Sequence, residues 1–215
     1  MGNKQVHYLI VPGWYGSEEE HWQSHWERSL PQASRVHQKD WVNPNLTDWV
    51  EALDQHIRQI SGQVILVAHS LGCITVVHWA QTANAAQAAK VAGALLVAPA
   101  DVERPNCPAA LTGFAPIPLK ALPFPSVLVG SSNDSAATAE RAYRFGQAWG
   151  SKVTILANAG HINVKSGHGP WQAGYRYLYQ LQTLIERQKR SSQPAKDNWS
   201  FQGLPRSSFG YAVSY

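Results

Sequence analysis

The sequence predicts an α/β protein built on one mostly parallel sheet with helices on both faces. Apolar runs rich in β-branched residues alternate with longer amphipathic segments, a spacing typical of right-handed crossovers between parallel strands. The runs "VILVAH" and "VAGALLVAPA" are apolar almost without a break, as central parallel strands are because both of their sides are buried. A chain of 215 residues with 44% hydrophobic content is long enough for one domain with a sizeable core.

Each apolar, β-branched run predicts a strand, and each longer amphipathic segment predicts a helix. In chain order, strands are expected at 6–12, 34–38, 63–69, 91–98, 126–130 and 152–156. Helices are expected at 21–30, 47–60, 71–89, 136–149 and 171–188. The segment 101–125 is crowded with proline, which neither a regular helix nor an interior strand accepts. We therefore expect an irregular segment there, a candidate lid over a pocket.

The net charge of +4 comes from one end of the chain. Residues 1–186 hold 13 basic and 13 acidic residues, whereas 187–215 hold five basic residues and one acidic residue. A neutral body offers no broad basic face for phosphates, so nucleic acid is not an expected partner. We expect one domain over 1–186, followed by a basic, solvated or loosely attached extension over 187–215. Its aromatic residues could dock on the body or on a partner: Trp199, Phe201, Phe209, Tyr211 and Tyr215.

Three further features limit the function. The apolar run near the amino terminus is about five residues long, too short for a signal peptide or a membrane span. With only Cys73 and Cys107, no disulfide framework is indicated, which favours a cytoplasmic setting. His21 and His25 stand four apart, as two metal ligands on one helical face would, but no HExxH glutamate or third ligand accompanies them. We therefore expect neither a metal nor a cofactor.

The pentapeptide A-H-S-L-G, residues 68–72, joins a predicted strand to a predicted helix. It resembles a nucleophile elbow, G-x-S-x-G, with Ala68 in place of the first glycine, and Ser70 would lie at the carboxyl end of a central strand. A phosphate-binding loop would need a lysine after the last glycine, where Cys73 stands. The remaining alternative is that Ser70 only caps the helix that follows.

A serine nucleophile needs a base and an acid, which in this kind of sheet follow later in the chain on separate loops. Only His161 and His168 follow the last predicted strand. His161 is the candidate base, because it lies in a glycine-containing loop directly after that strand. His168 is the second candidate for the base. Asp134, in the loop after the fifth strand, is the candidate acid, although it could instead cap the next helix. Asp101 is the reserve acid.

The negative oxygen that develops in acyl transfer needs two backbone donors. The N–H of Leu71, directly after the serine at the start of a helix, is one candidate. The other is expected from the loop "VPGWYGS", where Trp14 or Tyr15 offers its N–H. Trp14 is also a candidate to line the acyl pocket, together with Tyr15 and His69.

The chain resembles the small single-domain α/β-hydrolases that include the retinoblastoma-binding serine hydrolase and the bacterial YdeN-like proteins. The residues that carry the resemblance are "PGWYGSEEEHWQSHWE", "AHSLGCITVVHWA", "SSNDSAATAERAYRFGQAWGS" and "NAGHINVKSGHGPW". It implies a reduced α/β-hydrolase sheet of about six strands in the order 2-1-3-4-5-6, with Ser70, Asp134 and His161 at the catalytic positions. The L-x-C-x-E motif tied to retinoblastoma binding is absent, because Thr75 stands at its last position, so that role is not carried over.

The expected function is therefore a serine hydrolase that forms an acyl-enzyme on a small or medium carboxylic ester. Amide and thioester hydrolysis pass through the same tetrahedral oxyanion and stay open as alternatives. A noncatalytic interaction protein that keeps the fold and docks partners through its extension is the main rival.

Overall fold

The computed structural model describes residues 6–191 and contains one six-stranded parallel sheet in the order β2-β1-β3-β4-β5-β6. This confirms the predicted α/β class and strand order. The strands are β1 (Val6–Val11), β2 (Ala33–Arg35), β3 (Gln63–His69), β4 (Val91–Val97), β5 (Ser126–Ser131) and β6 (Lys152–Leu156). The helices are α1 (Trp22–Ser29), α2 (Leu46–Gln59), α3 (Leu71–Thr82), α4 (Ala85–Ala88), α5 (Ala139–Trp149) and α6 (Tyr175–Ser191).

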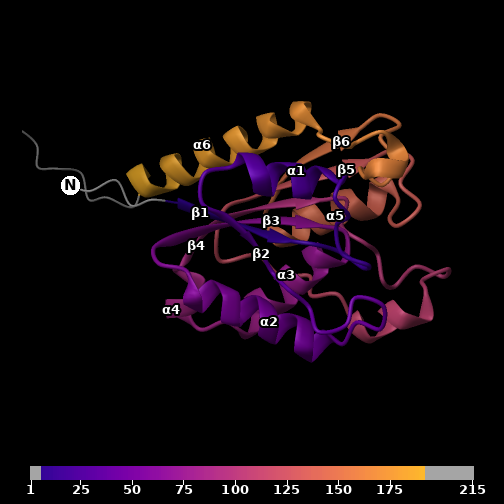
Figure 1. Ribbon diagram of the computed structural model, residues 1–215, viewed down its shortest axis with the longest axis horizontal. Helices are drawn as coiled ribbons and strands as arrows, with labels where there is room; N and C mark the ends of the chain where they lie inside the picture. The colour runs from indigo at the N-terminus through magenta and orange to yellow at the C-terminus, as the bar shows by residue number, and fades with distance from the viewer. Residues whose placement is uncertain (1–5, 192–215) are drawn as a thin grey trace, which may run out of the picture.

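Helices cover both faces of the sheet, with α1 and α6 on one side and α2 and α3 on the other (Figure 1). Alternate strand residues supply the two cores because successive side chains of a strand point to opposite faces. In β3, Val64, Leu66 and Ala68 pack with α2, α3 and α5, whereas Ile65 and Val67 pack with α1 and α6. β3 is thus buried on both faces, and the residue that follows it emerges at the rim of the sheet.

Several helix boundaries differ from the prediction, and for α4 and α5 a side-chain cap decides where the helix begins. The segment 71–89 splits in two, since Asn84 starts α4 with a capping box that its side chain shares with Gln87. Helix α5 begins at Ala139, where the Thr138 hydroxyl accepts a hydrogen bond from the Arg141 N–H. The last helix begins at Tyr175, after a 3₁₀ turn at Gln172–Gly174.

Helix α6 continues to Ser191, so the first five residues of the extension predicted from Arg187 are helical. The rest of that extension, with its five aromatic residues, lies outside the described residues. No helix within 6–191 carries an apolar stretch of the length needed to cross a membrane.

The proline-rich segment 101–125 packs against the body. It contains a 3₁₀ helix at Ala109–Phe114, and Phe114 is buried with its ring edge-on to Trp49 of α2. Asp101 and Glu103 both form ion pairs with Arg141 of α5. The segment is therefore fixed to the core on the α2 and α5 side.

Candidate active site

Ser70 occupies a sharp turn between β3 and α3. Its backbone has φ 55° and ψ −122°, a combination that a residue with a Cβ adopts only at a cost of about 1–3 kcal/mol, and such strain gathers at functional sites. The turn requires glycine at two neighbouring positions, because a side chain there would clash. A Cβ added at Gly72 would lie 2.3 Å from the Val11 carbonyl oxygen, and a Cβ added at Gly13 would lie 2.7 Å from the Ser70 Cβ. The Ser70 side chain makes no capping hydrogen bond to α3, so the capping alternative does not describe this serine.

The loops that follow β5 and β6 bring Asp134 and His161 to Ser70. The Ser70 hydroxyl lies 2.9 Å from His161 Nε2, and His161 Nδ1 lies 2.9 Å from each Asp134 carboxylate oxygen. An Nδ1–H that donates to the carboxylate leaves the Nε2 lone pair free to accept the serine proton. The Asp134 side chain is 2% exposed and that of His161 is 20% exposed. This set of contacts has the geometry required for nucleophilic acyl transfer.

The two reserve candidates have other partners. Asp101 pairs with Arg141 at 3.1 Å. His168 Nδ1 lies 3.2 Å from the Ser166 hydroxyl, and its ring stands edge-on to Trp171. Asp134 does accept a hydrogen bond from the Ala136 N–H at 2.8 Å, although α5 starts three residues later. It therefore orders its own loop while it contacts His161.

Polar contacts from two sides hold the His161 loop, and sequence reasoning missed all of them. On the β5 side, the side-chain amide oxygen of Asn133 accepts from the Gly160 N–H, and the Ser131 hydroxyl accepts from the Ala159 N–H. On the α1 side, Trp22 Nε1 donates to the Ile162 carbonyl oxygen. The short polar run "SSND" directly after a strand is the one local signal that could have pointed to them.

Gln23 of α1 is fully buried and ties two strand ends together at this rim. Its amide nitrogen donates to the carbonyl oxygens of Val11 in β1 and Val67 in β3, while its amide oxygen accepts from the Ser17 hydroxyl. These three bonds connect α1 to the end of β1, to Ser17 in the loop that follows it, and to β3, which leads into Ser70. Gln23 therefore helps to set the spacing of these segments. Sequence reasoning also missed this residue.

The candidate oxyanion donors lie on either side of Ser70. Leu71 is the first residue of α3. In the loop after β1, the Tyr15 N–H already donates to the Trp41 carbonyl oxygen at 3.1 Å, so Trp14 is the better candidate of the pair. The Trp14 indole donates to the Val42 carbonyl oxygen at 2.8 Å and stacks on the Tyr15 ring, which orders this loop before any substrate arrives.

A cavity of about 350 Å³ opens above the serine. Its walls contain Trp14, Tyr15, Gly16, Glu18, His21, His69, Ser70, His161, Asn163 and Lys165. The candidate pocket residues Trp14, Tyr15 and His69 lie in this wall. No residue of 101–125 belongs to this wall, so the expectation of a proline-rich lid is wrong for this cavity.

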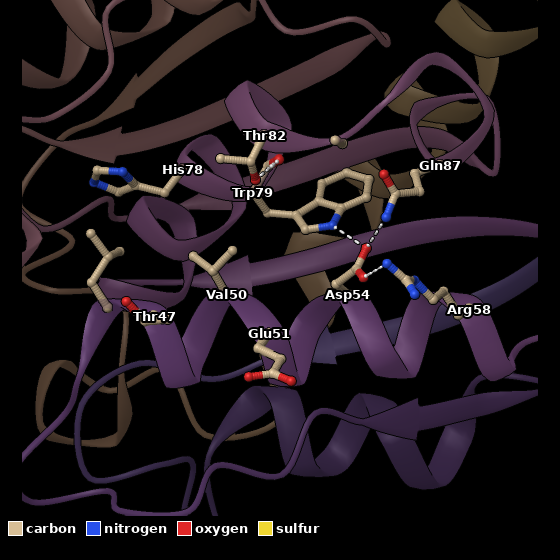
Figure 2. A pocket seen from close by; sticks show the side chains of 11 residues that line it. Thr47, Val50, Glu51, Asp54, Arg58, His78, Trp79, Thr82 and Gln87 are labelled. Atoms are coloured by element: carbon tan, nitrogen blue, oxygen red, sulfur yellow. Dashed lines mark hydrogen bonds and ion pairs between the residues drawn. The ribbon is translucent and has the colours of Figure 1, made fainter.

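A second cavity, of about 440 Å³, lies between α2 and α3 (Figure 2). Figure 2 shows Asp54 on α2, which accepts hydrogen bonds from Trp79 and Gln87 and pairs with Arg58. That carboxylate is fully engaged by its neighbours. This cavity contains none of Ser70, Asp134 and His161, so we assign it no acyl-transfer chemistry.

Stability is expected to fall in acid because two buried histidines of the site are neutral. Burial, followed by Arg35 and His161, lowers the pKa of His21 to about 3, and burial, followed by His161 and His21, holds the pKa of His69 well below its ordinary value. Below pH 6.5 the unfolded chain binds these protons and the folded chain does not, so stability is lost as the pH falls. Urea unfolding at pH 5 should give a free energy lower than at pH 7 by about 2 kcal/mol from His21 alone. In His21→Asn the dependence on pH should weaken; an unchanged dependence would contradict the assignment.

Comparison with known proteins agrees with the fold. The family model "Serine hydrolase" matches residues 8–180. A YdeN-like hydrolase from Pectobacterium atrosepticum is 34% identical, with 86% of this chain and 92% of that chain covered and a TM-score of 0.70. The ydeN gene product of B. subtilis is 18% identical, with 84% and 100% covered and a TM-score of 0.66.

More distant structures share the fold alone. Est1E from Butyrivibrio proteoclasticus, solved with ferulic acid bound, is 13% identical, with 87% of this chain and 89% of that chain covered and a TM-score of 0.57. No curated protein sequence matches the chain. The family match spans most of the chain and the first structure is more than 30% identical over most of both chains, so this chain belongs to the serine hydrolase family, among the YdeN-like α/β-hydrolases.

Proposed function

We propose that this protein hydrolyses small or medium carboxylic esters through an acyl-enzyme on Ser70. The observation that carries the proposal is the continuous hydrogen-bonded set from the Ser70 hydroxyl through His161 to Asp134. A cavity of about 350 Å³ above the serine lies at the small end of ligand sites, which favours a compact substrate. Thioesters and amides share the same tetrahedral oxyanion and remain substrates to compare.

The mechanism follows from the contacts of each group. His161 Nε2 takes the proton of Ser70 as its oxygen attacks the ester carbonyl, and Asp134 stabilises the imidazolium that forms. The N–H groups of Leu71 and Trp14 donate to the oxyanion. Return of the proton to the departing alcohol leaves the acyl-enzyme, and His161 then activates the water that releases the acid. Every step uses groups of the protein, the ester and water.

A fluorophosphonate probe tests the proposal directly. The folded protein should be labelled, with the adduct on the peptide that contains Ser70, because the probe reacts only with an activated serine. Heat-denatured protein and Ser70→Ala should not be labelled. Absence of labelling on protein that circular dichroism shows to be folded would favour the noncatalytic interaction protein instead.

The cytoplasm as its place of action also remains a proposal. It rests on cysteine use: Cys73 and Cys107 are both free thiols, as expected in a reducing compartment.

A further inference from the structure

Two buried histidines line the cavity beside Ser70 and have no part in the mechanism above. His21 precedes α1 and His69 precedes Ser70, and each side chain belongs to a residue that is 5% exposed. Their ring centroids lie 4.8 Å apart, and the His69 ring lies 4.9 Å from that of His161. The ring nitrogens of His21 and His69 therefore lie close to the reacting atoms.

The hydrogen bond that His21 makes fixes which of its nitrogens carries a proton. His21 Nδ1 accepts from the backbone N–H of Gln23 at 3.2 Å, as the cap of α1. An accepting Nδ1 is unprotonated, so the neutral ring carries its proton on Nε2. His21 therefore has a free N–H donor.

The contact of His69 fixes the opposite tautomer. His69 Nε2 lies 2.9 Å from the backbone carbonyl oxygen of His161. A carbonyl only accepts, so Nε2 carries the proton and the Nδ1 of the neutral ring has a free lone pair. Burial keeps both rings neutral, since it lowers the pKa of each.

Both free atoms are reached through the cavity. Within residues 6–191, no group forms a hydrogen bond with His21 Nε2 or with His69 Nδ1. Neither atom is among the fully buried polar atoms without a partner, so both are accessible to solvent. Both residues line the cavity wall, which accounts for their small exposed fraction. The cavity thus contains one neutral donor and one neutral acceptor within the reach of a single group beside Ser70.

We propose that His21 and His69 form a subsite for an uncharged hydroxyl group, so that the preferred substrates are hydroxy-substituted esters; this rests on the proposed ester hydrolysis at Ser70. A hydroxyl oxygen accepts from His21 Nε2–H while its proton is donated to His69 Nδ1. A carboxylate would face the lone pair of His69, and an ammonium group would face the N–H of His21. An alkyl chain would leave both nitrogens unpaired.

Matched esters test the subsite, because a hydroxyl and a methyl group are similar in size. The first pair is 2-hydroxyethyl butyrate and propyl butyrate, which differ in the alcohol part. The second is methyl 3-hydroxypropanoate and methyl butyrate, which differ in the acyl part. In the wild type, at least one hydroxyl ester should exceed its partner in kcat/KM on the order of tenfold, as expected when a ligand leaves a buried polar pair unmatched.

His21→Asn separates recognition from helix capping, because asparagine is a good N-cap and has no ring N–H at the Nε2 position. The variant should lose the hydroxyl preference, so that the ratio of kcat/KM between each hydroxyl ester and its alkyl partner falls to about one. His25→Asn is the matched control on the same helix, where the side chain is 28% exposed and pairs with Glu20. It should keep the preference.

The outcomes separate the subsite from the hydrolase. Equal kcat/KM values of the wild type within both ester pairs would overturn the subsite, and this result does not depend on whether the variant folds. A hydroxyl preference that is retained in His21→Asn would also overturn it. Fluorophosphonate labelling of Ser70 without turnover of either hydroxyl ester overturns it too, while the reactive serine stands. Absence of both labelling and turnover is the failure of the proposed hydrolase itself.

Discussion

Replacing His161 with alanine is expected to lower kcat/KM for p-nitrophenyl acetate on the order of 10⁴-fold or more, and to abolish fluorophosphonate labelling. A serine hydroxyl is a weak nucleophile at neutral pH, and His161 Nε2 is the base within 2.9 Å of it. The imidazole is one-fifth exposed, so its removal should leave the fold intact. Steady-state kinetics and a thermal melt measure the two effects.

His168→Ala is the matched control for this prediction. His168 follows the same loop, but its ring contacts Ser166 and Trp171. The variant should keep most of its turnover and labelling. If His168→Ala loses activity while His161→Ala retains it, the assignment of the base is wrong.

Asp134→Asn is expected to lower kcat on the order of 10⁴-fold with little change in structure. The amide oxygen of asparagine can still accept from the Ala136 N–H, as Asp134 does. Its NH₂ group, however, would face His161 Nδ1 as a donor, which favours the tautomer with its proton on Nε2. That nitrogen then cannot accept the Ser70 proton. A pre-steady-state burst that disappears would locate the loss in acylation.

Asp101→Asn provides the control for the acid. Because Asp101 pairs with Arg141, the variant should lose stability in urea and keep its kcat. A fall in kcat that matches that of Asp134→Asn, with stability unchanged, would place Asp101 in the catalytic set.

The sequence patterns predicted the sheet well where burial leaves a local signature. The bounds 63–69 and 152–156 agree with β3 and β6, since apolar and β-branched runs are what a pleated, buried strand requires. The continuous helix over 71–89 was wrong, because the apolar pattern continues past Thr82 while the Asn84 side chain caps a new helix. Whether the helix continues or a new one starts at a cap depends on a few hydrogen bonds, and the hydrophobic pattern of the sequence does not show these.

The site was predicted only as far as its motifs reach. Ser70, Asp134 and His161 could be chosen because each follows a strand at the same rim. One of the contacts that hold them, Trp22 to Ile162, joins residues 140 positions apart and leaves no local pattern. His21 shows a different limit: α1 begins at Trp22, so His21 caps the helix and does not share a helical face with His25, as the four-residue spacing had suggested.

Gln23 connects helix α1 to the strand ends next to Ser70. If α1 were to open locally, the carbonyl oxygens of Val11 and Val67 would lose the hydrogen bonds that Gln23 donates inside the core, and the His161 loop would lose the Trp22 contact in the same event. The loss of buried hydrogen bonds is costly, so local opening of this helix alone is disfavoured. Helix α1, the ends of β1 and β3 and the histidine loop are therefore expected to open as one cooperative unit, and that opening would expose and disorder the serine turn in the same event.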